Sequence, residues 1–337
     1  MKPVVALVTA RAARGLDEDE APLAAALRAA GAQVEIADWD DASASWESFD
    51  LALLRSTWDY TERLSEFLAW VQRAAGLTAL CNPAEVVRWN TDKHYLLDLA
   101  RADVPTVTSC FVEPGDSAAG ALDDFLSKLQ EPELVVKPAV GGGSRDTNRY
   151  KRHSRDAAVA HARQLLDAGR SVLLQPYLDR VEEYGETALI FYAGYFDPPA
   201  GVKPGARGGA SSNVMQFDHA IRKGPMLPAP RDELSGPAVG GASPLFVPEH
   251  ITPRTAQADE LEIAARTLAA IPHQGLLYAR IDLIRDAAGA TRLLELELTE
   301  PSLFFAHSPG SAERFARLVL DRAPRAARGH LPFSFKT

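Results

Sequence analysis

Cysteine is scarce in this chain of 337 residues: Cys81 and Cys110 are the two present, and they lie far apart. Their number and spacing match neither a disulfide framework nor a metal-binding pair, so two buried free thiols are expected. The histidines form neither an HExxH motif nor a spaced cluster, which argues against a zinc site. The G-x-S-x-G motif is also missing, which excludes a serine hydrolase of the nucleophile-elbow type.

Long hydrophobic runs and an excess of positive charge are missing as well. No apolar segment approaches the roughly 18 residues that span a bilayer, and residues 1–8 resemble a buried strand more than a signal peptide. We therefore expect a cytoplasmic protein. Lysine and arginine total 36 against 45 aspartates and glutamates, a balance that argues against a nucleic-acid partner. Hydrophobic residues make up 46% of the chain, which excludes global disorder and suits two or three globular domains.

The first third of the chain alternates short apolar segments with helical patterns. Strands are expected at residues 4–8, 33–37, 49–54 and 78–81, and helices at residues 20–30 and 63–75. Such alternation predicts βαβ units with a parallel sheet, in which functional residues follow the carboxyl ends of strands. The segment after the third strand supplies candidate substrate-binding residues: Arg55, Ser56, Thr57 and Asp59, with Trp58 and Tyr60 shaping the pocket. A structural turn around a buried tryptophan is the alternative.

The remaining chain combines helices, strands and two long loops. Helices are expected at residues 91–102, 118–128, 157–166, 256–270 and 313–327, and strands at residues 107–112, 134–137, 171–175 and 217–223. The stretches 197–216 and 225–253 are rich in Gly and Pro, and loops of that length are usually functional or mobile. Lys93 falls in the first turn of the helix expected from Thr91, where the helix dipole disfavours a cation. An anionic partner for Lys93 is therefore expected.

A hairpin with a charged face is expected near the end of the chain, from residues 276–285 and 291–298 joined by the turn 286–289. A four-residue turn places Arg280 opposite Glu295 and Asp282 opposite Leu293, and one face then carries Arg280, Asp282, Glu295 and Glu297. Three carboxylates on one face repel each other unless a cation lies among them, and hard oxygen ligands suit Mg²⁺. A half-solvated hairpin with one salt bridge is the alternative.

Three further segments have the character of a nucleotide site. The strand 134–137 ends in Lys137 and is followed by the loop Gly141, Gly142, Gly143 and Ser144; backbone N–H groups of such loops wrap phosphate oxygens, although the P-loop motif is not present. Residues 175–178 leave a strand as an extended segment suited to an adenine edge, and Glu186, at the start of the next strand, suits ribose hydroxyls. Arg222 and Lys223, at a strand end, suit phosphate. A flexible turn, a strand crossing and a solvated edge are the respective alternatives.

Taken in order, these segments resemble the ATP-grasp superfamily of ligases over residues 82–302. A narrower likeness, carried by residues 55–60, 219–225 and 300–304, is to the ATP-grasp cyclo-ligases that close the ring of D-cycloserine. Bacterial glutathione synthetase-like proteins are more distantly similar. Two features depart from the pattern: Glu297 stands where D-alanine–D-alanine ligases often have Asn, and residues 197–216 look like an insertion before the cationic strand.

The resemblance implies a role for each candidate residue. Contacts with ATP are implied for Lys93, Lys137, Gly141, Gly142, Gly143, Ser144, Gln175, Tyr177, Leu178 and Glu186. Metal ligation is implied for Asp282, Glu295 and Glu297, and catalysis for Arg280 and Lys223. Arg145 and Ser302 join Arg55, Ser56, Thr57 and Asp59 as candidate substrate contacts.

The implied fold is α/β: an ATP-grasp fold, with two α+β subdomains gripping ATP, preceded by a Rossmann-like N-terminal domain. The expected domains are residues 1–88 (N-terminal), 89–180 (central subdomain with the Gly-rich lid loop) and 181–337 (C-terminal subdomain with the metal site). The implied enzyme is a Mg-ATP-dependent ligase that joins an amino-acid-like carboxylate to an amine through an acyl phosphate. Its implied cofactors are ATP and Mg²⁺, as two ions, with Mn²⁺ as a substitute.

Three other functions remain open from the sequence. One is an intramolecular cyclo-ligase that forms a small heterocycle, of the O-ureido-serine/D-cycloserine type. The second is a kinase of the same fold, which gives a stable phosphorylated product. The third is a non-catalytic nucleotide-binding protein, although retention of Lys137 and of the acidic hairpin argues against it. In each enzymatic case the expected partner is a small molecule that carries a carboxylate, with neither nucleic acid nor membrane involved.

Overall fold

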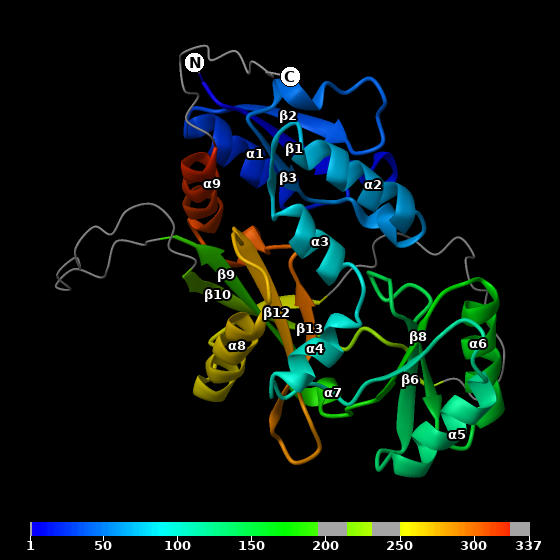
Figure 1. The fold of residues 1–337 in the computed structure, drawn as a ribbon. Coiled ribbons are helices and arrows are strands. Elements are labelled where there is room, and N and C mark those ends of the chain that lie inside the picture. Colours follow the sequence, from blue (N-terminus) through cyan, green and yellow to red (C-terminus); the bar gives the residue numbers. More distant parts are fainter. Residues whose placement is uncertain (1, 195–213, 231–249, 324–337) are drawn as a thin grey trace.

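The computed structural model describes residues 2–194, 214–230 and 250–323, which form three sheets with helices packed against them (Figure 1). Each sheet lies within one of the three ranges expected as domains, and the boundaries themselves stay a prediction. The stretch 197–216, interpreted above as an insertion, lies outside the described residues apart from its last three. Most of the second Gly- and Pro-rich stretch, 225–253, lies outside them as well.

The first sheet is parallel, as the alternation of strands and helices predicted. Its order is β2-β1-β3-β4, formed by β1 (Val4–Thr9), β2 (Gln33–Asp38), β3 (Leu51–Leu54) and β4 (Ala79–Cys81). The connecting helices are α1 (Glu20–Ala29) and α2 (Leu64–Ala75), with short 3-10 helices η1 (Arg11–Ala13), η2 (Trp46–Ser48) and η3 (Trp58–Thr61). Because η3 begins four residues after β3 ends, its side chains lie at the carboxyl edge of this sheet.

The second sheet is antiparallel and carries a layer of two helices. Its order is β5-β8-β6-β7, formed by β5 (Cys110–Val112), β6 (Glu133–Pro138), β7 (Asn148–Lys151) and β8 (Val172–Pro176). The helices are α5 (Ala118–Lys128) and α6 (Arg155–Asp167), whose buried leucines share one apolar cluster with the sheet. Of these elements, the sequence analysis did not predict β7, a short strand without an apolar alternation.

The third sheet is also antiparallel, with the order β11-β10-β9-β12-β13. Its strands are β9 (Glu186–Ala193), β10 (Met215–Lys223), β11 (Ile251–Arg254), β12 (Tyr278–Arg285) and β13 (Thr291–Glu297). The associated helices are α7 (Val181–Tyr184), α8 (Ala258–Ala270), η4 (Phe305–His307) and α9 (Ser311–Arg322). Gly185 joins α7 to β9 with a φ of 76°, a left-handed conformation that side chains rarely adopt.

The hairpin of β12 and β13 has a different register from the one predicted. Arg285 pairs with Thr291, so the turn has five residues, and a bulge after Asp282 shifts the pairing by one residue. As a result Asp282 lies opposite Glu295 and Arg280 lies opposite Glu297. The longer turn and the bulge each shift the pairing by one residue relative to the predicted register. Because the total shift is two residues, the charged side chains stay on one face. The predicted face is therefore confirmed, whereas the predicted pairs are wrong.

The helix predicted from Thr91 to residue 102 is wrong in its start. Two shorter helices occur instead, α3 (Ala84–Asn90) and α4 (Tyr95–Arg101), and Lys93 lies in the turn between them. The backbone N–H of Lys93 donates to Ala139 O at 3.0 Å, a residue that follows β6. This long-range hydrogen bond fixes the turn against the second sheet, and local sequence signals do not reveal it.

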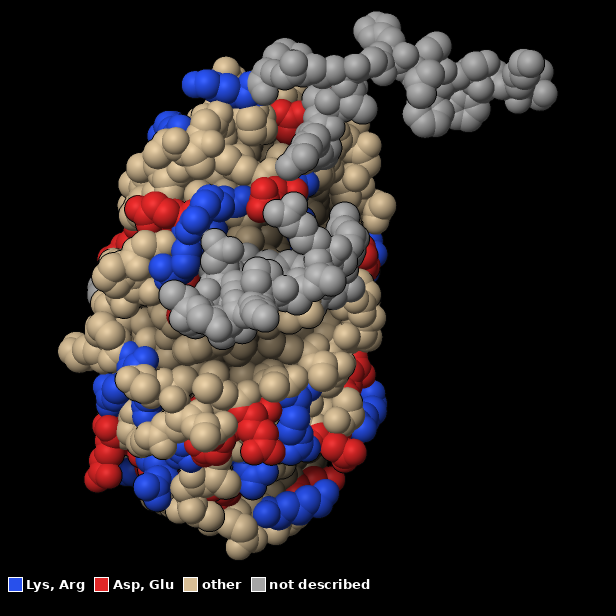
Figure 2. All heavy atoms as spheres, turned by 90° about the vertical axis from the view of Figure 1, so that its left-hand side faces the viewer, with Lys and Arg blue, Asp and Glu red and all other residues tan. Residues whose placement is uncertain are grey.

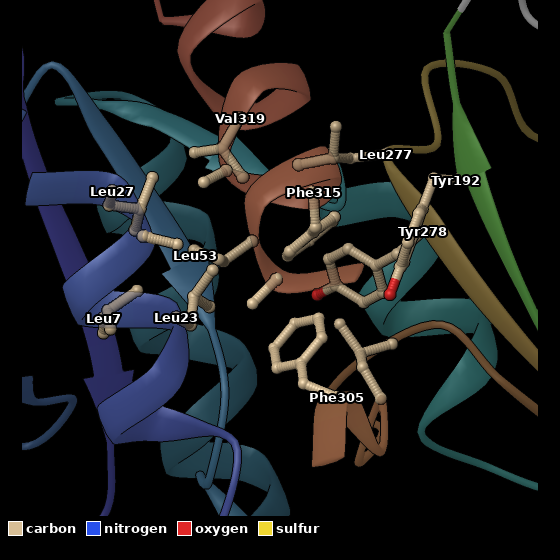
Figure 3. Packing of buried hydrophobic residues seen from close by; sticks show 14 of the residues in the cluster. Leu7, Leu23, Leu27, Leu53, Tyr192, Leu277, Tyr278, Phe305, Phe315 and Val319 are labelled. Atoms are coloured by element: carbon tan, nitrogen blue, oxygen red, sulfur yellow. The ribbon is translucent and has the colours of Figure 1, made fainter. Parts of the chain in front are cut away.

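A shared hydrophobic core joins the first and third sheets (Figure 3). Leu7, Leu23, Leu27 and Leu53 of the N-terminal domain pack in one cluster with the aromatic side chains of the third sheet and of α9: Tyr192, Tyr278 and Phe315. All of them are fully buried, and burial of each side chain of this size contributes about 1.5–3 kcal/mol. The N-terminal domain is thus held firmly against the third sheet, with α9 lying beside α1 in Figure 1.

The surface seen in Figure 2 carries charged side chains of both signs. Over its lower part, lysine and arginine are interspersed with aspartate and glutamate, so that part of the face has no large area of a single sign.

Candidate active site

A cavity of about 180 Å³ lies between the second and third sheets and brings together the residues predicted to contact a nucleotide. All ten of them line it: Lys93, Lys137, Gly141, Gly142, Gly143, Ser144, Gln175, Tyr177, Leu178 and Glu186. They come from the turn between α3 and α4, the end of β6 and its following loop, the end of β8, and the start of β9. Segments separated by more than 90 residues in the sequence therefore converge on one cavity.

Apolar side chains that the sequence analysis did not single out form one wall of this cavity. Val107, Val135, Val181 and Ile284 belong to a buried cluster that also contains Tyr177 and Leu178, and all of these residues line the cavity. A flat apolar slot with backbone groups at its edge suits a planar ring such as a purine. In the sequence these residues are indistinguishable from ordinary core positions, so pattern reasoning could not have found them.

Lys137 is held in the cavity without a partner of its own. Its amine makes neither a hydrogen bond nor an ion pair with another described residue. Burial lowers the pKa of Lys137 to about 8. Repulsion from Lys93 and Lys223 adds to this shift, and attraction from Glu295 and Glu186 opposes it. A buried cation left unpaired is unfavourable. An anionic ligand in the cavity would stabilise the charged form.

Lys93 has the anionic partner that its position predicted. Its Nζ lies 3.0 Å from Glu295 Oε1 and donates to Gly141 O at 2.7 Å. Through these contacts one lysine ties the acidic hairpin to the start of the Gly-rich loop. Gly143 and Ser144 in this loop have φ values of 59° and 56°, in the left-handed region that side chains rarely adopt.

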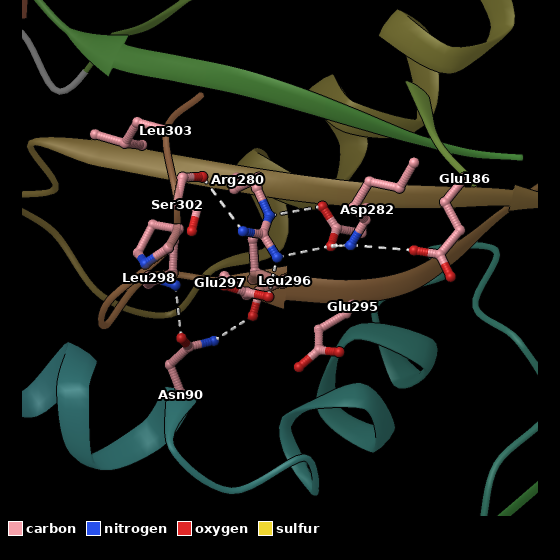
Figure 4. Close-up of polar contacts among 12 residues, drawn as sticks. Asn90, Glu186, Arg280, Asp282, Glu295, Leu296, Glu297, Leu298, Ser302 and Leu303 are labelled. Carbon is pink, nitrogen blue, oxygen red and sulfur yellow. Dashed lines mark hydrogen bonds and ion pairs between the residues drawn. The ribbon is translucent and has the colours of Figure 1, made fainter. Parts of the chain in front are cut away.

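Three residues of the charged face, Arg280, Asp282 and Glu297, form one network (Figure 4). Arg280 reaches Asp282 with two donors, Nε to Oδ1 at 2.9 Å and Nη2 to Oδ2 at 3.0 Å, and also pairs with Glu297. Lys223 Nζ lies 2.7 Å from Asp282 Oδ2 and 3.1 Å from Glu186 Oε2. Each predicted metal ligand, Asp282, Glu295 and Glu297, therefore has a cation of the chain against it. Lys223 and Arg280, the predicted catalytic residues, lie within this network and line the cavity.

The donor set of this face fits Mg²⁺ by its chemistry. In the present side-chain arrangement, no three His, Cys, Asp or Glu side chains of the described ranges are grouped to hold a metal ion. Burial raises the pKa of Glu297 above its usual range, and repulsion from Asp282 and Glu295 adds to this shift. Attraction from Arg280 opposes it. Carboxylates crowded in this way accept a divalent cation favourably, because it removes their repulsion and provides the hard oxygen coordination that Mg²⁺ prefers.

A second, smaller cavity of about 100 Å³ adjoins the first. The two share Lys93, Arg280, Glu295, Glu297 and the glycines Gly141, Gly142 and Gly143. The rest of the smaller cavity is lined by Trp58, Tyr60, Arg145, Glu300 and Ser302, with neighbouring residues. The shared residues thus stand between the larger and the smaller cavity. Of the predicted substrate contacts, Arg145 and Ser302 line this smaller cavity, as do Trp58 and Tyr60.

The other four predicted substrate contacts do not line either cavity. Arg55 is 1% exposed; its guanidinium lies 3.3 Å from Asp17 and donates to Pro301 O at 3.1 Å. Ser56 and Thr57 are fully buried, and Asp59 accepts a 2.8 Å hydrogen bond from Trp39 Nε1. The structure therefore gives Arg55, Ser56, Thr57 and Asp59 internal contacts, because the chain turns into η3 directly after β3. In this segment the aromatic residues reach the cavity and the polar ones face inward.

Glu300 is the cavity residue whose importance the sequence did not reveal. Burial, opposed by the Tyr60 hydroxyl and by Lys93, raises the pKa of Glu300 to about 7. It follows β13 by three residues, beyond the alternating pattern that pointed to Glu295 and Glu297. The signal in the sequence was the segment 300–304, which carries the narrower resemblance but assigns no role to Glu300 itself.

Comparison with known proteins shows similarity along nearly the whole chain. Residues 5–82 match the family model described as "D-cycloserine synthetase DcsG, N-terminal domain". The cycloserine biosynthesis protein DcsG of Streptomyces lavendulae is 37% identical over 325 residues, covering 95% of this chain and 98% of that protein. The crystal structure of D-cycloserine synthetase DcsG has a TM-score of 0.80 at 35% identity, covering 95% of this chain and 99% of that one.

More distant solved structures share the fold. The ATP-grasp ligase PsnB, in complex with a minimal precursor, Mg and ADP, has a TM-score of 0.57 at 16% identity, with 95% of this chain and 98% of that chain covered. Among the described residues, every helix is too short or too polar to cross a membrane.

Proposed function

This chain belongs to the D-cycloserine synthetase family of ATP-grasp ligases, and from that membership we propose that it closes a ring within a single amino-acid-like substrate. The chain is an ATP-dependent ligase that forms C–N bonds. In the proposed reaction one molecule supplies both the carboxylate and the nitrogen nucleophile, as in the O-ureido-serine type of cyclisation. A cytoplasmic location is part of the proposal, because the reaction consumes ATP.

The observation that carries this proposal is the pair of adjoining cavities with shared charged residues. A small amino-acid-like substrate in the smaller cavity, of about 100 Å³, would lie next to the larger cavity, with the shared residues Lys93, Arg280, Glu295 and Glu297 between the two ligands. The choice of cyclisation over ligation rests on membership in the D-cycloserine synthetase family.

We assign binding of ATP to the larger cavity and of Mg²⁺ to the acidic face of the hairpin. Lys93 and Lys137 are proposed to contact phosphates, Gln175, Tyr177 and Leu178 the adenine, and Glu186 the ribose. Asp282, Glu295 and Glu297 are proposed to hold Mg²⁺, as two ions, with Mn²⁺ as a substitute. When bound, Mg²⁺ neutralises phosphate charge and so makes the γ-phosphorus a better electrophile.

The first chemical step is proposed to be activation of the substrate carboxylate. A carboxylate oxygen attacks the γ-phosphorus, the bond to the β-phosphate oxygen breaks, and an acyl phosphate and ADP result. The chain contributes positioning and positive charge, from Lys137 and Lys223, where negative charge accumulates. The Gly-rich loop from Gly141 to Ser144 lies between the two cavities and is placed to exclude water, which would otherwise hydrolyse the acyl phosphate.

The second step is proposed to be ring closure. A nitrogen of the same substrate attacks the acyl carbon and a C–N bond forms. The C–O bond to phosphate breaks, and the departing phosphate takes up the proton that the nitrogen loses. Negative charge develops on the acyl oxygen, and Arg280, which lines both cavities, is the cation placed to stabilise it. Hydrogen bonds from Arg280 to Asp282 and to Ser302 O, the latter at 3.2 Å, fix its orientation.

The proposal is tested by incubating the purified chain with Mg-ATP and O-ureido-serine, with serine and other amino acids as comparison compounds. We expect equal amounts of ADP and phosphate, and a cyclic product identified by mass spectrometry. ADP with a stable phosphorylated product would instead indicate a kinase. A product that combines two molecules would indicate intermolecular ligation, and absence of ATP binding would indicate a non-catalytic protein.

A further inference from the structure

The smaller cavity contains one carboxylate that forms no salt bridge with a lysine or arginine of the described chain. Glu295 and Glu297, which line it, pair with Lys93 and Arg280 respectively. Glu300 lines the same cavity, yet none of the described lysines or arginines forms a salt bridge with it. Its neighbour is the hydroxyl of Tyr60, a residue that is 5% exposed. A partly buried carboxylate of this kind is unfavourable in isolation and becomes favourable when a cation is supplied.

The smaller cavity is lined by both positive and negative side chains, as a ligand with one carboxylate and one ammonium group requires. Arg280 and Arg145 line it; Arg280 pairs with Asp282 and Glu297, and Arg145 pairs with Glu62, while the Nε of Arg145 is buried without a hydrogen-bond partner among the described residues. These arginines provide donors for a carboxylate, next to the residues shared with the larger cavity. Glu300 provides a hydrogen-bond acceptor, and the aromatic rings of Trp58 and Tyr60 provide an electron-rich wall. Both features suit an ammonium group.

We propose that Glu300, supported by the Tyr60 hydroxyl, binds the α-ammonium group of the substrate and thereby selects a free amino acid over the corresponding acid without an amine. The inference rests on the proposed function, since it names the chemical class that the same cavity accepts. Glu300 is a specificity residue in this account: the ammonium group it holds is neither the attacking nitrogen nor the leaving group.

Two further observations support this assignment. Arg55 donates to Pro301 O, and Asp19 accepts backbone N–H groups of Leu303 and Phe304 at 2.6 and 2.9 Å, so the segment that carries Glu300 is fixed on its C-terminal side. Burial raises the pKa of Glu300 to about 7, and repulsion from Glu295 adds to this shift. Tyr60, Lys93 and Arg280 oppose it. A cationic ligand would reverse it, because a neighbouring positive charge favours the carboxylate.

The test compares O-ureido-serine with its analogue that lacks the α-amino group, using Glu300→Gln, which keeps the shape and removes the charge. For the unaltered chain, we expect the KM of the amino compound to be about 10- to 100-fold below that of the analogue, the range of one charge-assisted hydrogen bond. In Glu300→Gln, the KM of the amino compound should rise by the same factor while the KM of the analogue stays unchanged. Glu47→Gln, at an exposed position of η2, is the matched control and should change neither value.

Tyr60→Phe gives a second variant that removes one hydroxyl, in case Glu300→Gln does not fold. It should raise the KM of the amino compound about 3- to 10-fold, as expected for one neutral hydrogen bond. Equal KM values of the two compounds for the unaltered chain would overturn the proposal. So would an equal fall in kcat for both compounds in Glu300→Gln, which would make Glu300 a general base. If neither compound supports ADP release by the unaltered chain, the proposed function fails instead, which separates the two failures.

Discussion

Lys137 is the residue whose charge depends most directly on the ligand, since its amine has no partner among the described residues and its pKa is lowered to about 8. Below this pH the free protein already carries the cation that a phosphate needs. Above it, the lysine must take up a proton when the nucleotide binds. Nucleotide affinity is therefore linked to pH through this side chain.

We predict that the affinity for ATP, measured by calorimetry between about pH 7 and about pH 10, is constant at the lower end and falls by up to about tenfold per pH unit above about pH 8. Lys137→Arg should remove this fall, because a guanidinium stays charged throughout the range. An affinity of the unaltered chain that stays constant up to the highest pH would contradict the role given to Lys137.

A second prediction concerns Glu295, which Lys93 pairs with at 3.0 Å. Glu295→Gln should lower the rate of ADP formation by at least about 100-fold, because it removes a charge from the proposed metal site. The circular dichroism spectrum should stay native. Glu262→Gln, at an exposed position of α8, is the control and should keep full activity. Retained turnover in a purified Glu295→Gln protein would count against the metal assignment.

Most polar residues of the two cavities were predictable from the sequence, whereas Glu300 of the smaller cavity and the apolar wall of the larger one were not. Lys137 and the glycines after it carry their chemistry in a local pattern, a strand end followed by a flexible loop. Glu300 has no such pattern around it. Arg55 follows a strand as a site residue would, but Asp17, 38 residues earlier in the chain, draws it into the interior.

At the scale of secondary-structure elements, the hairpin shows how far periodicity reaches. Alternation in β12 and β13 fixed which side chains share a face, because successive residues of a strand point to opposite sides. It left the register undetermined, since the bulge after Asp282 and the longer turn have no local signature. Both depend on how β12 pairs with β9 on its other edge.

The segment after β13 depends on a single carboxylate. Asp19 accepts backbone N–H groups of Leu303, Phe304 and Phe305 at 2.6, 2.9 and 2.9 Å. Asp19→Asn should lower the free energy of unfolding by about 3–5 kcal/mol, because it removes the charge opposite buried Arg55 and replaces an acceptor by a donor. Chemical denaturation measures this change.

The neighbouring substitution Glu18→Gln provides the control for Asp19→Asn. Glu18 is exposed, so the change in stability should stay within about 0.5 kcal/mol. Equal stability of the two variants would show that the 303–305 backbone does not depend on Asp19.

Gly185, between α7 and β9, permits a further prediction because a matched glycine exists. A Cβ at Gly185 would lie 2.6 Å from Lys223 O, whereas a Cβ at Gly169 would meet nothing within 4 Å, and the two φ values are 76° and 74°. Both alanine substitutions carry the backbone strain of about 1–3 kcal/mol. Gly185→Ala should cost more and should also raise the KM for ATP, because it displaces Glu186 and Lys223. Equal effects of the two substitutions on stability and on KM would contradict this account.

At the scale of the whole molecule, the sequence of strands and helices along the chain was predictable, whereas the packing of the sheets against each other was not. Alternating strands and helices predicted the parallel first sheet, and the ordered set of weak motifs predicted the ATP-grasp fold that the solved relatives share. The core that joins the first and third sheets through Leu23, Tyr278 and Phe315 combines residues from both ends of the chain. Contacts over such distances leave no trace in local periodicity. They nevertheless position Trp58 and Tyr60 beside the acidic hairpin.

The central claim is that ATP activates the substrate carboxylate by direct phosphoryl transfer between the two adjoining cavities. It is tested most directly with O-ureido-serine labelled with ¹⁸O in its carboxylate, in a single turnover with Mg-ATP. The account predicts one ¹⁸O atom in each inorganic phosphate released, because the acyl phosphate gives up a carboxylate oxygen when the C–N bond forms. Phosphate without the label, released at the same rate as the product, would contradict it.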